Sequence, residues 1–308
     1  MNTPIFNKIP MTRVRIAVAH ALYFLFRVFL RKNNRIIQRS GIFYEVDLSE
    51  GIDLSLFLFG NFQSYVIQNK YFSLEKDAIV FDVGANVGSM ALRFAQGASE
   101  GHVYAFEPTD YAFKKLQRNL SLNPRLAERI SVVQQFLSDQ TQSDHQIQAY
   151  ASWKVDGSAK NSHPLHGGTI KPAESVSAIT LDQFCAQNQI QRIDLIKIDT
   201  DGHEHKVLKG ARKTIKKYLP FVVFEIGGYV LNEQGIEFEQ FHDYFESLGY
   251  SLLNTKNGKK INLQNFSNQI PLRATTDIIA IPPKSLRWAN FRFFELKTIL
   301  RKIIEIVV

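Results

Sequence analysis

Groups that could accept or donate a proton crowd the end of one apolar segment, IDLIKIDTDGHEH. They are Asp199, Asp201, His203, Glu204 and His205. A reacting hydroxyl is almost fully protonated at neutral pH, and a carboxylate or imidazole at this place could take its proton. Asp199 ends the apolar run, where an idle buried carboxylate would be costly. Asp201 and Glu204 could instead stabilise a helix N-terminus, and histidines two apart do not share a helix face. We take Asp199, Asp201 and Glu204 as the catalytic candidates.

Three further positions carry weaker signals. Glu225 ends the apolar segment FVVFEIG in the way that Asp199 ends its own. His163 and His166, in NSHPLHGG, have a spacing that metal sites use, but two histidines without carboxylates are a weak pattern. A divalent ion shared by Asp199 and Asp201 could fit, although we do not expect one.

A second stretch, FDVGANVGSM, combines an acidic strand end with two glycines. Asp82 would end a strand that runs into a helix N-terminus, at the edge where parallel sheets bind their ligands. Gly84 and Gly88 let the backbone turn sharply and approach a ligand closely, and Asn86 adds a short polar side chain. Glu107 ends the next apolar segment, where a carboxylate could accept hydrogen bonds from both hydroxyls of a ribose. The pattern indicates a nucleoside-like ligand.

The pattern differs from a dinucleotide site, which would show G-x-G-x-x-G and place a pyrophosphate at the helix N-terminus. Here Asp82 would face that pyrophosphate with a like charge. An ammonium group suits the acidic turn better, and S-adenosylmethionine carries an ammonium group together with a ribose and an adenine. S-adenosylmethionine is therefore the expected cofactor. A nucleotide-cofactor-binding oxidoreductase and a catalytically silent scaffold on the same fold stay as alternatives.

Short apolar segments alternate with helical patterns from residue 79 onward, as in an α/β sheet. The sequence predicts strands over 78–84, 102–108, 130–137, 193–199, 221–227, 250–255 and 275–283. It predicts helices over 87–96, 110–123, 181–189, 205–218 and 237–249. Seven mostly parallel strands with a hairpin-like end are the layout of a class I methyltransferase (Rossmann-like) sheet.

The chain resembles the FkbM-type methyltransferases over about residues 41–281. The resemblance is carried by IVFDVGANVGSMALRFA, VYAFEPTDYAFKKLQRNL, FLSDQTQ, and above all ITLDQFCAQNQIQRIDLIKIDTDGHEHKVLKGA followed by FVVFEIG. It implies transfer of a methyl group from S-adenosylmethionine to an oxygen, commonly a hydroxyl of a sugar or of a glycan-, lipid- or polyketide-linked product.

The resemblance also implies roles for individual residues of this chain. It implies that Asp82, Gly84, Asn86 and Gly88 form the loop at the methionine end of the cofactor and that Glu107 holds the ribose. Ser138 or Asp139 would lie near the adenine. The family usually has glutamate where this chain has Asp201, which weakens the role of that residue.

Charge is distributed unevenly along the chain. The net charge is +8, and residues 1–40 alone supply +8 while residues 284–308 supply +4, so the body between them carries −4. A basic groove for nucleic acid in the body is therefore not expected. The single cysteine, Cys185, excludes an internal disulfide and multi-cysteine metal sites, and fits the cytoplasm.

Both basic ends place apolar residues at helical spacing, and we expect amphipathic helices over 1–40 and 284–308. The longest uncharged run near the start, 16–26, is shorter than the ~20 residues that cross a bilayer. These helices could lie on the inner face of an anionic membrane, pack on the body, or pack on a second subunit. A lead-in segment over 41–78 would pack on the sheet of the methyltransferase domain, 79–283. No residue pattern identifies the methyl acceptor or fixes the oligomeric state.

Overall fold

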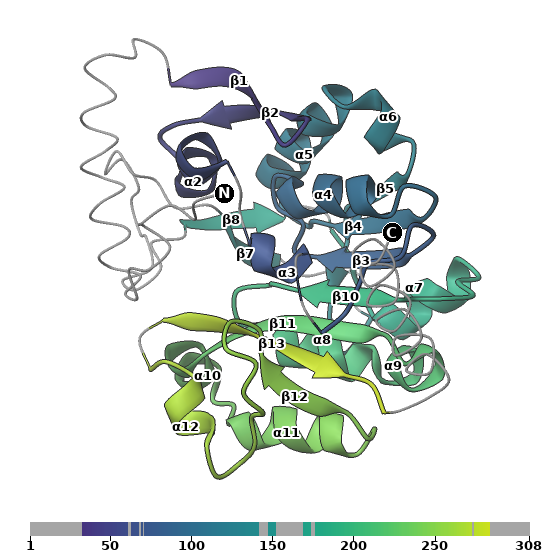
Figure 1. Cartoon of the computed structure of the whole chain (residues 1–308), viewed down its shortest axis with the longest axis vertical. Helices are drawn as coiled ribbons and strands as arrows, with labels where there is room; N and C mark the ends of the chain where they lie inside the picture. The colour runs from purple at the N-terminus through teal and green to yellow at the C-terminus, as the bar shows by residue number, and fades with distance from the viewer. Residues whose placement is uncertain are drawn as a thin grey trace, which may run out of the picture.

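The structure is a computed structural model, and its central feature is one seven-stranded sheet (Figure 1). The described residues are 33–60, 63–67, 69, 71–141, 147–151, 169–173, 176–272 and 274–283. In spatial order the strands are β12 (Ser251–Asn254), β13 (Thr275–Ile281), β11 (Phe221–Gly227), β10 (Leu195–Ile198), β3 (Ile79–Val83), β4 (His102–Phe106) and β5 (Ile130–Val133). Only β13 runs antiparallel to its neighbours in this sheet, β11 and β12. Each predicted strand contributes a strand to this sheet, and the class I methyltransferase fold is confirmed.

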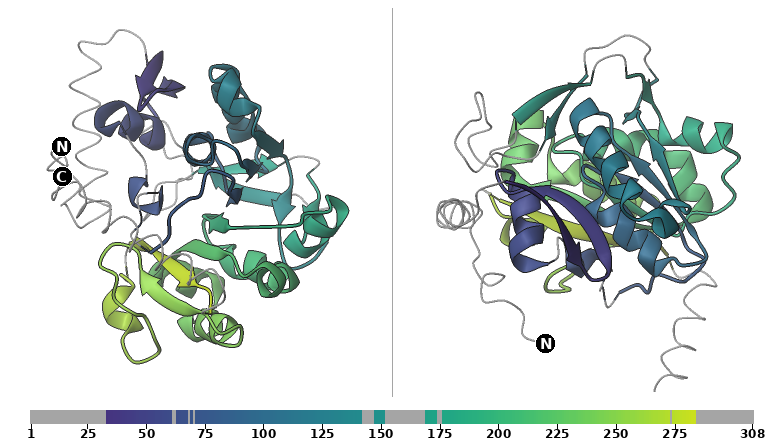
Figure 2. Two further views of the ribbon diagram at one scale, coloured as in Figure 1. Left: turned by 45° about the vertical axis from the view of Figure 1, so that its right-hand side comes forward. Right: turned by 90° about the horizontal axis from the view of Figure 1, so that it is seen from above.

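Helices cover both faces of this sheet (Figure 2). Successive strand residues point to opposite faces, so Val80 and Phe81 belong to two different apolar cores. One face packs against α4 (Ser89–Gly97), α5 (Asp110–Ser121) and the lead-in. The other packs against α7 (Leu181–Gln187), α8 (Glu204–Gly210), α9 (Arg212–Tyr218) and α11 (Phe238–Glu246). The predicted helix over 205–218 is therefore two helices, α8 and α9.

Smaller elements complete the described chain. They are the helices α6 (Pro124–Ala127), α10 (Gly228–Gln234) and α12 (Phe266–Gln269), and the paired strands β6 (Phe136–Leu137) with β9 (Ala178–Ile179) and β7 (Ile147–Ala151) with β8 (Thr169–Ala173). The sequence predicted a single strand over 130–137, but the structure divides it into β5 and β6. A two-residue strand is too short to show a strand period, so β6 and β9 had no separate signal.

The lead-in, predicted over 41–78, starts earlier in the structure, with a hairpin of β1 (Asn34–Arg39) and β2 (Ile42–Asp47), followed by α2 (Gly51–Phe59) and α3 (Ser64–Ile67). Residues 34–39 were expected to belong to a helix over 1–40, and for them that prediction is wrong. Ser40 and Gly41 both adopt positive φ, which is the two-residue hairpin turn whose twist matches paired strands. The turn pairs the branched residues Ile36 and Ile37 with β2, so this stretch forms a strand.

Two buried asparagines, one on α5 and one just after it, attach the hairpin to the body. Asn123 accepts a hydrogen bond from the Phe43 amide at 2.9 Å and donates to the Phe43 carbonyl at 2.6 Å. Asn119 accepts from the Glu45 amide at 2.8 Å and donates to the Val87 carbonyl at 2.8 Å. Asn119 thus joins β2 to the glycine-rich turn that follows β3.

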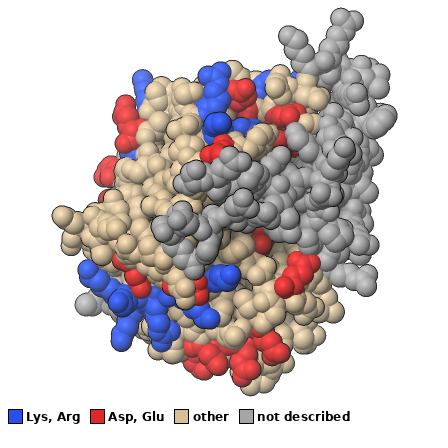
Figure 3. Space-filling model, turned by 180° about the vertical axis from the view of Figure 1, so that it is seen from behind, with Lys and Arg blue, Asp and Glu red and all other residues tan. Residues whose placement is uncertain are grey.

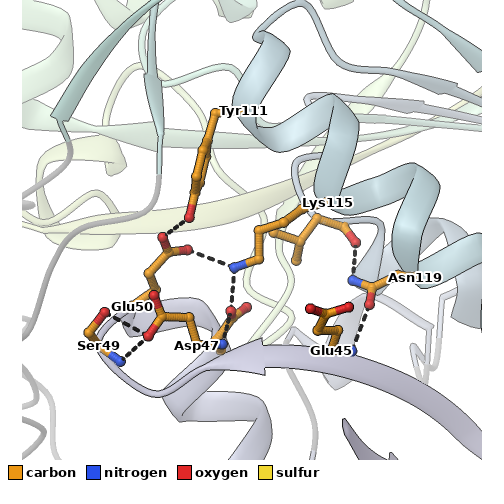
Figure 4. Close-up of polar contacts among 9 residues, drawn as sticks. Glu45, Asp47, Ser49, Glu50, Tyr111, Lys115 and Asn119 are labelled. Carbon is orange, nitrogen blue, oxygen red and sulfur yellow. Dashed lines mark hydrogen bonds and ion pairs between the residues drawn. The ribbon is translucent and has the colours of Figure 1, made fainter. Parts of the chain in front are cut away.

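A buried ion cluster reinforces this attachment (Figure 4). Lys115 of α5 contacts Glu50 at 2.8 Å and also Asp53, and both carboxylates are 1% exposed. Tyr111 donates its hydroxyl hydrogen to Glu50. Burial raises the pKa of Asp53 to about 6, and the Lys115 ammonium opposes that rise. One cation therefore balances two buried carboxylates between α2 and α5.

Exposed basic residues lie along α8 and α9: Lys206, Lys209, Arg212, Lys213, Lys216 and Lys217. These helices form a basic surface at the lower left of the space-filling view (Figure 3). The predicted terminal helices fall mostly on 1–32 and 284–308, outside the described residues. Within the described ranges, no helix combines the length and apolarity that crossing a bilayer requires.

The ion cluster yields a test with a matched control on the same helix. Lys115→Met removes the Lys115 ammonium from beside two buried carboxylates, and we expect it to lower the free energy of unfolding by about 3 kcal/mol or more. Arg118→Met breaks a pair with Glu45 whose side chains are 54% and 37% exposed, and should cost about 0–1 kcal/mol. Urea unfolding followed by circular dichroism measures both, and equal losses would contradict the assigned importance of the cluster.

Candidate active site

A cavity lies at the carboxyl ends of β3, β4 and β10. Five of the predicted site residues line it: Gly84, Asn86, Glu107, Asp199 and Asp201. The other four, Asp82, Gly88, Ser138 and Glu204, do not line it. Its apolar wall includes Phe106, Phe136 and Leu137. The structure therefore brings the glycine-rich turn and the end of β10 together, although they are more than a hundred residues apart in the sequence.

Gly84 allows the close approach of these two segments. Its φ is +79°, and a Cβ atom there would lie 1.8 Å from the carbonyl oxygen of Asp199. Only a residue without a side chain fits such a position. Asn86 follows with φ +49°, and Gly88 is the N-cap of α4.

Glu107 is held in one orientation by its neighbours. Its Oε1 accepts hydrogen bonds from the amide and the hydroxyl of Thr109, at 2.9 and 2.6 Å. Its Oε2 accepts one from the Asn86 amide at 2.9 Å. Burial raises the pKa of Glu107, and the hydrogen bonds from Thr109 and Asn86 oppose the rise. A carboxylate offers about four acceptor positions, so one on Oε2 remains for a ligand.

A buried lysine connects the two acidic strand ends. Lys197 on β10 is paired in register with Asp82 on β3, so their side chains lie side by side on one face of the sheet. The Lys197 ammonium lies 3.4 Å from Asp82 and 3.3 Å from Asp199. Burial alone would lower the pKa of Lys197, but the carboxylates of Asp199 and Asp82 outweigh it and hold that pKa above its usual range. Asp82 is fully buried, and burial raises its pKa.

Gln63, just before α3, reaches the same site. Its amide nitrogen donates to Oδ2 of Asp199 at 2.8 Å. Neither Gln63 nor Lys197 stood out as a candidate in the sequence. The strict alternation in LIKID could have revealed Lys197, because it puts Lys197 and Asp199 on the same face of the strand. Gln63 gave no local signal, since it is 136 residues from its partner.

Asp201 and Glu225 form an acidic group with Asp199. Each of the three offers an oxygen atom, and these atoms all lie within 4.8 Å of one another. Burial, followed by the charge of Asp199, raises the pKa of Asp201 and of Glu225 well above the usual range. Such a group binds either protons or a hard divalent cation. The other predicted metal pair, His163 and His166, lies outside the described residues.

Glu204 closes the turn before α8. Its Oε1 accepts from the amide and the hydroxyl of Thr200, at 2.8 and 3.0 Å, and its Oε2 accepts from the Gly202 amide at 3.0 Å. Its carboxylate therefore holds the turn that carries Asp201 into the cavity. His203 packs edge-on against the Phe136 ring with 5.1 Å between ring centroids, and neither it nor His205 lines the cavity.

Ser138 lies just beyond the cavity wall. Its amide donates to the Ile179 carbonyl at 3.0 Å, and its hydroxyl contacts Asp139 at 3.2 Å. The preceding residues Gln135, Phe136 and Leu137 reach the cavity instead.

Comparison with known proteins finds a match to the methyltransferase FkbM domain over residues 82–252. The 2-O-methyltransferase NoeI of Sinorhizobium fredii is 29% identical over 159 residues, which are 47% of this chain and 62% of that protein. The hexuronic acid methyltransferase AglP of Haloferax volcanii is 25% identical over 152 residues, which are 49% of this chain and 57% of that protein. The chain thus spans about three fifths of the length of these relatives.

Among solved structures, a methyltransferase FkbM from Methylobacillus flagellatus KT aligns with a TM-score of 0.41 and 17% identity. The alignment covers 67% of this chain and 44% of that one.

The contact at Gly84 can be tested against a glycine of similar backbone conformation. Gly235→Ala places a Cβ in open space at φ +62°, so we expect only the backbone cost of about 1–2 kcal/mol. Gly84→Ala adds a clash with the Asp199 carbonyl and should cost about 1–3 kcal/mol more. Urea unfolding of both variants measures the difference, and equal stabilities would show that the turn and β10 do not depend on this close approach.

Proposed function

Because the chain belongs to the FkbM methyltransferase family, we propose that it transfers a methyl group from S-adenosylmethionine to a hydroxyl oxygen of a sugar in a glycan or glycolipid. The observation that carries this proposal is the cavity that joins the Gly84 turn, the oriented carboxylate of Glu107 and the carboxylate of Asp199.

The cavity suits S-adenosylmethionine on its own features. A Cβ atom at Gly84 would clash with the Asp199 carbonyl, so glycine at this position lets the turn and the end of β10 line one cavity. Oε2 of Glu107 keeps an acceptor position for a ribose hydroxyl. Phe136 and Leu137 offer an apolar surface for the adenine. The Asp199 carboxylate attracts the positive charges of the methionine end.

S-adenosylmethionine supplies an electrophilic methyl group, and its sulfur takes the electron pair of the broken carbon–sulfur bond. Asp199 accepts the proton of the attacking hydroxyl. Lys197 and Gln63 both occupy Oδ2 of Asp199, and no hydrogen bond from the described residues reaches Oδ1, so Oδ1 takes the proton. Asp201 is the weaker candidate for the base, because burial and the charge of Asp199 raise its pKa and so favour its protonated form. Glu204 acts by holding the turn.

A saccharide hydroxyl is the acceptor that we favour. One relative is named a 2-O-methyltransferase and another a hexuronic acid methyltransferase. The net charge of −4 over residues 41–283 disfavours a nucleic acid acceptor.

Two substitutions separate binding from chemistry. Glu107→Ala removes the ribose acceptor, and we expect affinity for S-adenosylmethionine to fall roughly tenfold to a hundredfold in calorimetry.

Asp199→Asn keeps the shape and removes the base, so the transfer rate should fall about a hundredfold or more while donor affinity changes little. The rate is measured with labelled donor on glycan and lipid extracts of the host, with and without a chelator.

Asp243→Asn, at an exposed position on α11, is the matched control and should behave as the parent protein. Unchanged donor affinity in Glu107→Ala would remove the ribose assignment. Full transfer by Asp199→Asn would show that another residue is the base. Loss of transfer in the presence of chelator would show that the acidic group of Asp199, Asp201 and Glu225 binds a divalent ion.

We also propose peripheral attachment to the inner face of an anionic membrane, where a lipid-linked acceptor would be found. Residues 1–32 carry six basic side chains and no acidic one. Anionic lipid attracts each nearby basic residue by about 1 kcal/mol. Deleting 1–32 leaves the hairpin intact and should abolish sedimentation with anionic liposomes, and high salt should weaken it in the full chain. A full-length protein that stays in the supernatant at low salt would favour a soluble acceptor.

A further inference from the structure

Gln63 is the point at which the lead-in touches the proposed base. Its side-chain amide must present nitrogen to Asp199, because its carbonyl oxygen would be repelled by the carboxylate. The resulting hydrogen bond to Oδ2 is 2.8 Å long. The same oxygen also faces the Lys197 ammonium at 3.3 Å.

Two features of Gln63 are unfavourable for the stability of the fold. Its φ is +48°, in the left-handed region that residues with a side chain rarely adopt. Its side-chain carbonyl oxygen is buried and has no hydrogen-bond partner in the part of the chain that the structure describes. Costs of this kind persist where the surrounding structure enforces them, and they gather at functional sites.

The two donors on Oδ2 determine how Asp199 faces its substrate. A carboxylate with one donor can rotate about its Cβ–Cγ bond, whereas donors from two directions fix its plane. Lys197 approaches along β10, and Gln63 approaches from the lead-in. The Asp199 side chain remains 20% exposed, so one part of it is still accessible to a ligand.

We propose that Gln63 is a positioning residue, which holds Oδ2 of Asp199 so that Oδ1 meets the hydroxyl of the methyl acceptor. This inference rests on the proposed role of Asp199 as the base. It makes the lead-in part of the catalytic machinery, although the family match begins only at residue 82.

The lead-in has the attachments that such a role needs. Lys115 and the buried asparagines fix β2 and α2 on α5. Asn119 extends the attachment to the glycine-rich turn through the Val87 carbonyl. Gln63 therefore belongs to a segment that is fixed to the methyltransferase body by several contacts.

The test compares Gln63→Leu and Gln63→Glu with Gln96→Leu. Gln96 on α4 also donates its amide to the lead-in, at 2.9 Å from the Ser40 carbonyl, but does not contact Asp199. The transfer rate is measured at saturating labelled S-adenosylmethionine with host glycan and lipid extract, and donor affinity is measured by calorimetry. We expect Gln63→Leu to transfer roughly tenfold to a hundredfold more slowly with unchanged donor affinity, and Gln63→Glu to be slower still because like charges then face each other. Gln96→Leu should keep the parent rate.

A double-substitution cycle separates positioning from a general structural effect. In the Asp199→Asn background, Gln63→Leu should cause almost no further loss of rate, because residues that act as one unit are not additive. An equal loss in both backgrounds, or an unchanged rate in Gln63→Leu alone, would overturn the inference. An absence of methyl transfer by the parent protein would instead overturn the proposed function.

Discussion

The buried ammonium of Lys197 is the interaction on which the arrangement of the site depends. Asp82 and Asp199 end neighbouring strands on the same face of the sheet, so without a cation between them a buried and a half-buried carboxylate would repel each other. Lys197 is 3% exposed and its ammonium lies within 3.4 Å of both carboxylates, so its positive charge offsets the repulsion between them. Asp201 and Glu225 make no ion pair among the described residues, and burial and the charge of Asp199 raise the pKa of both.

Helix α5 links the two sides of the cavity. Thr109, at its N-cap, orients Glu107, and Lys115 and Asn119 further along it hold the lead-in. The same helix therefore sets the carboxylate that would bind the ribose and supports the segment that places Gln63 against Asp199. A change in the packing of α5 would therefore alter the positions of both Glu107 and Gln63, although no residue of α5 lines the cavity.

The sequence predicted the parts of the fold that have a local pattern. Each of the seven sheet strands is an apolar run next to a helical pattern, and Gly84 and Glu107 end two of these runs. It did not predict β1, because the basic residues before it extended a helical pattern up to Ser40, and only the Ser40–Gly41 turn marks the hairpin. The role of Gln63 depends on a contact with a residue 136 positions away in the sequence. Glu204 was expected to be catalytic, because the sequence does not distinguish a carboxylate that closes a turn from one that takes part in the reaction. Tertiary contacts decide such roles, and a local pattern does not record them.

A crystal structure of the protein with S-adenosylhomocysteine would test the central claim most directly. We expect the ribose hydroxyls to lie within hydrogen-bond distance of Oε2 of Glu107. We also expect the sulfur to lie at the end of β10, with Oδ1 of Asp199 facing it across the space for an acceptor and Oδ2 still bound to Lys197 and Gln63. A nucleoside bound away from Glu107, or an Asp199 carboxylate turned so that Oδ1 faces Lys197, would contradict the account.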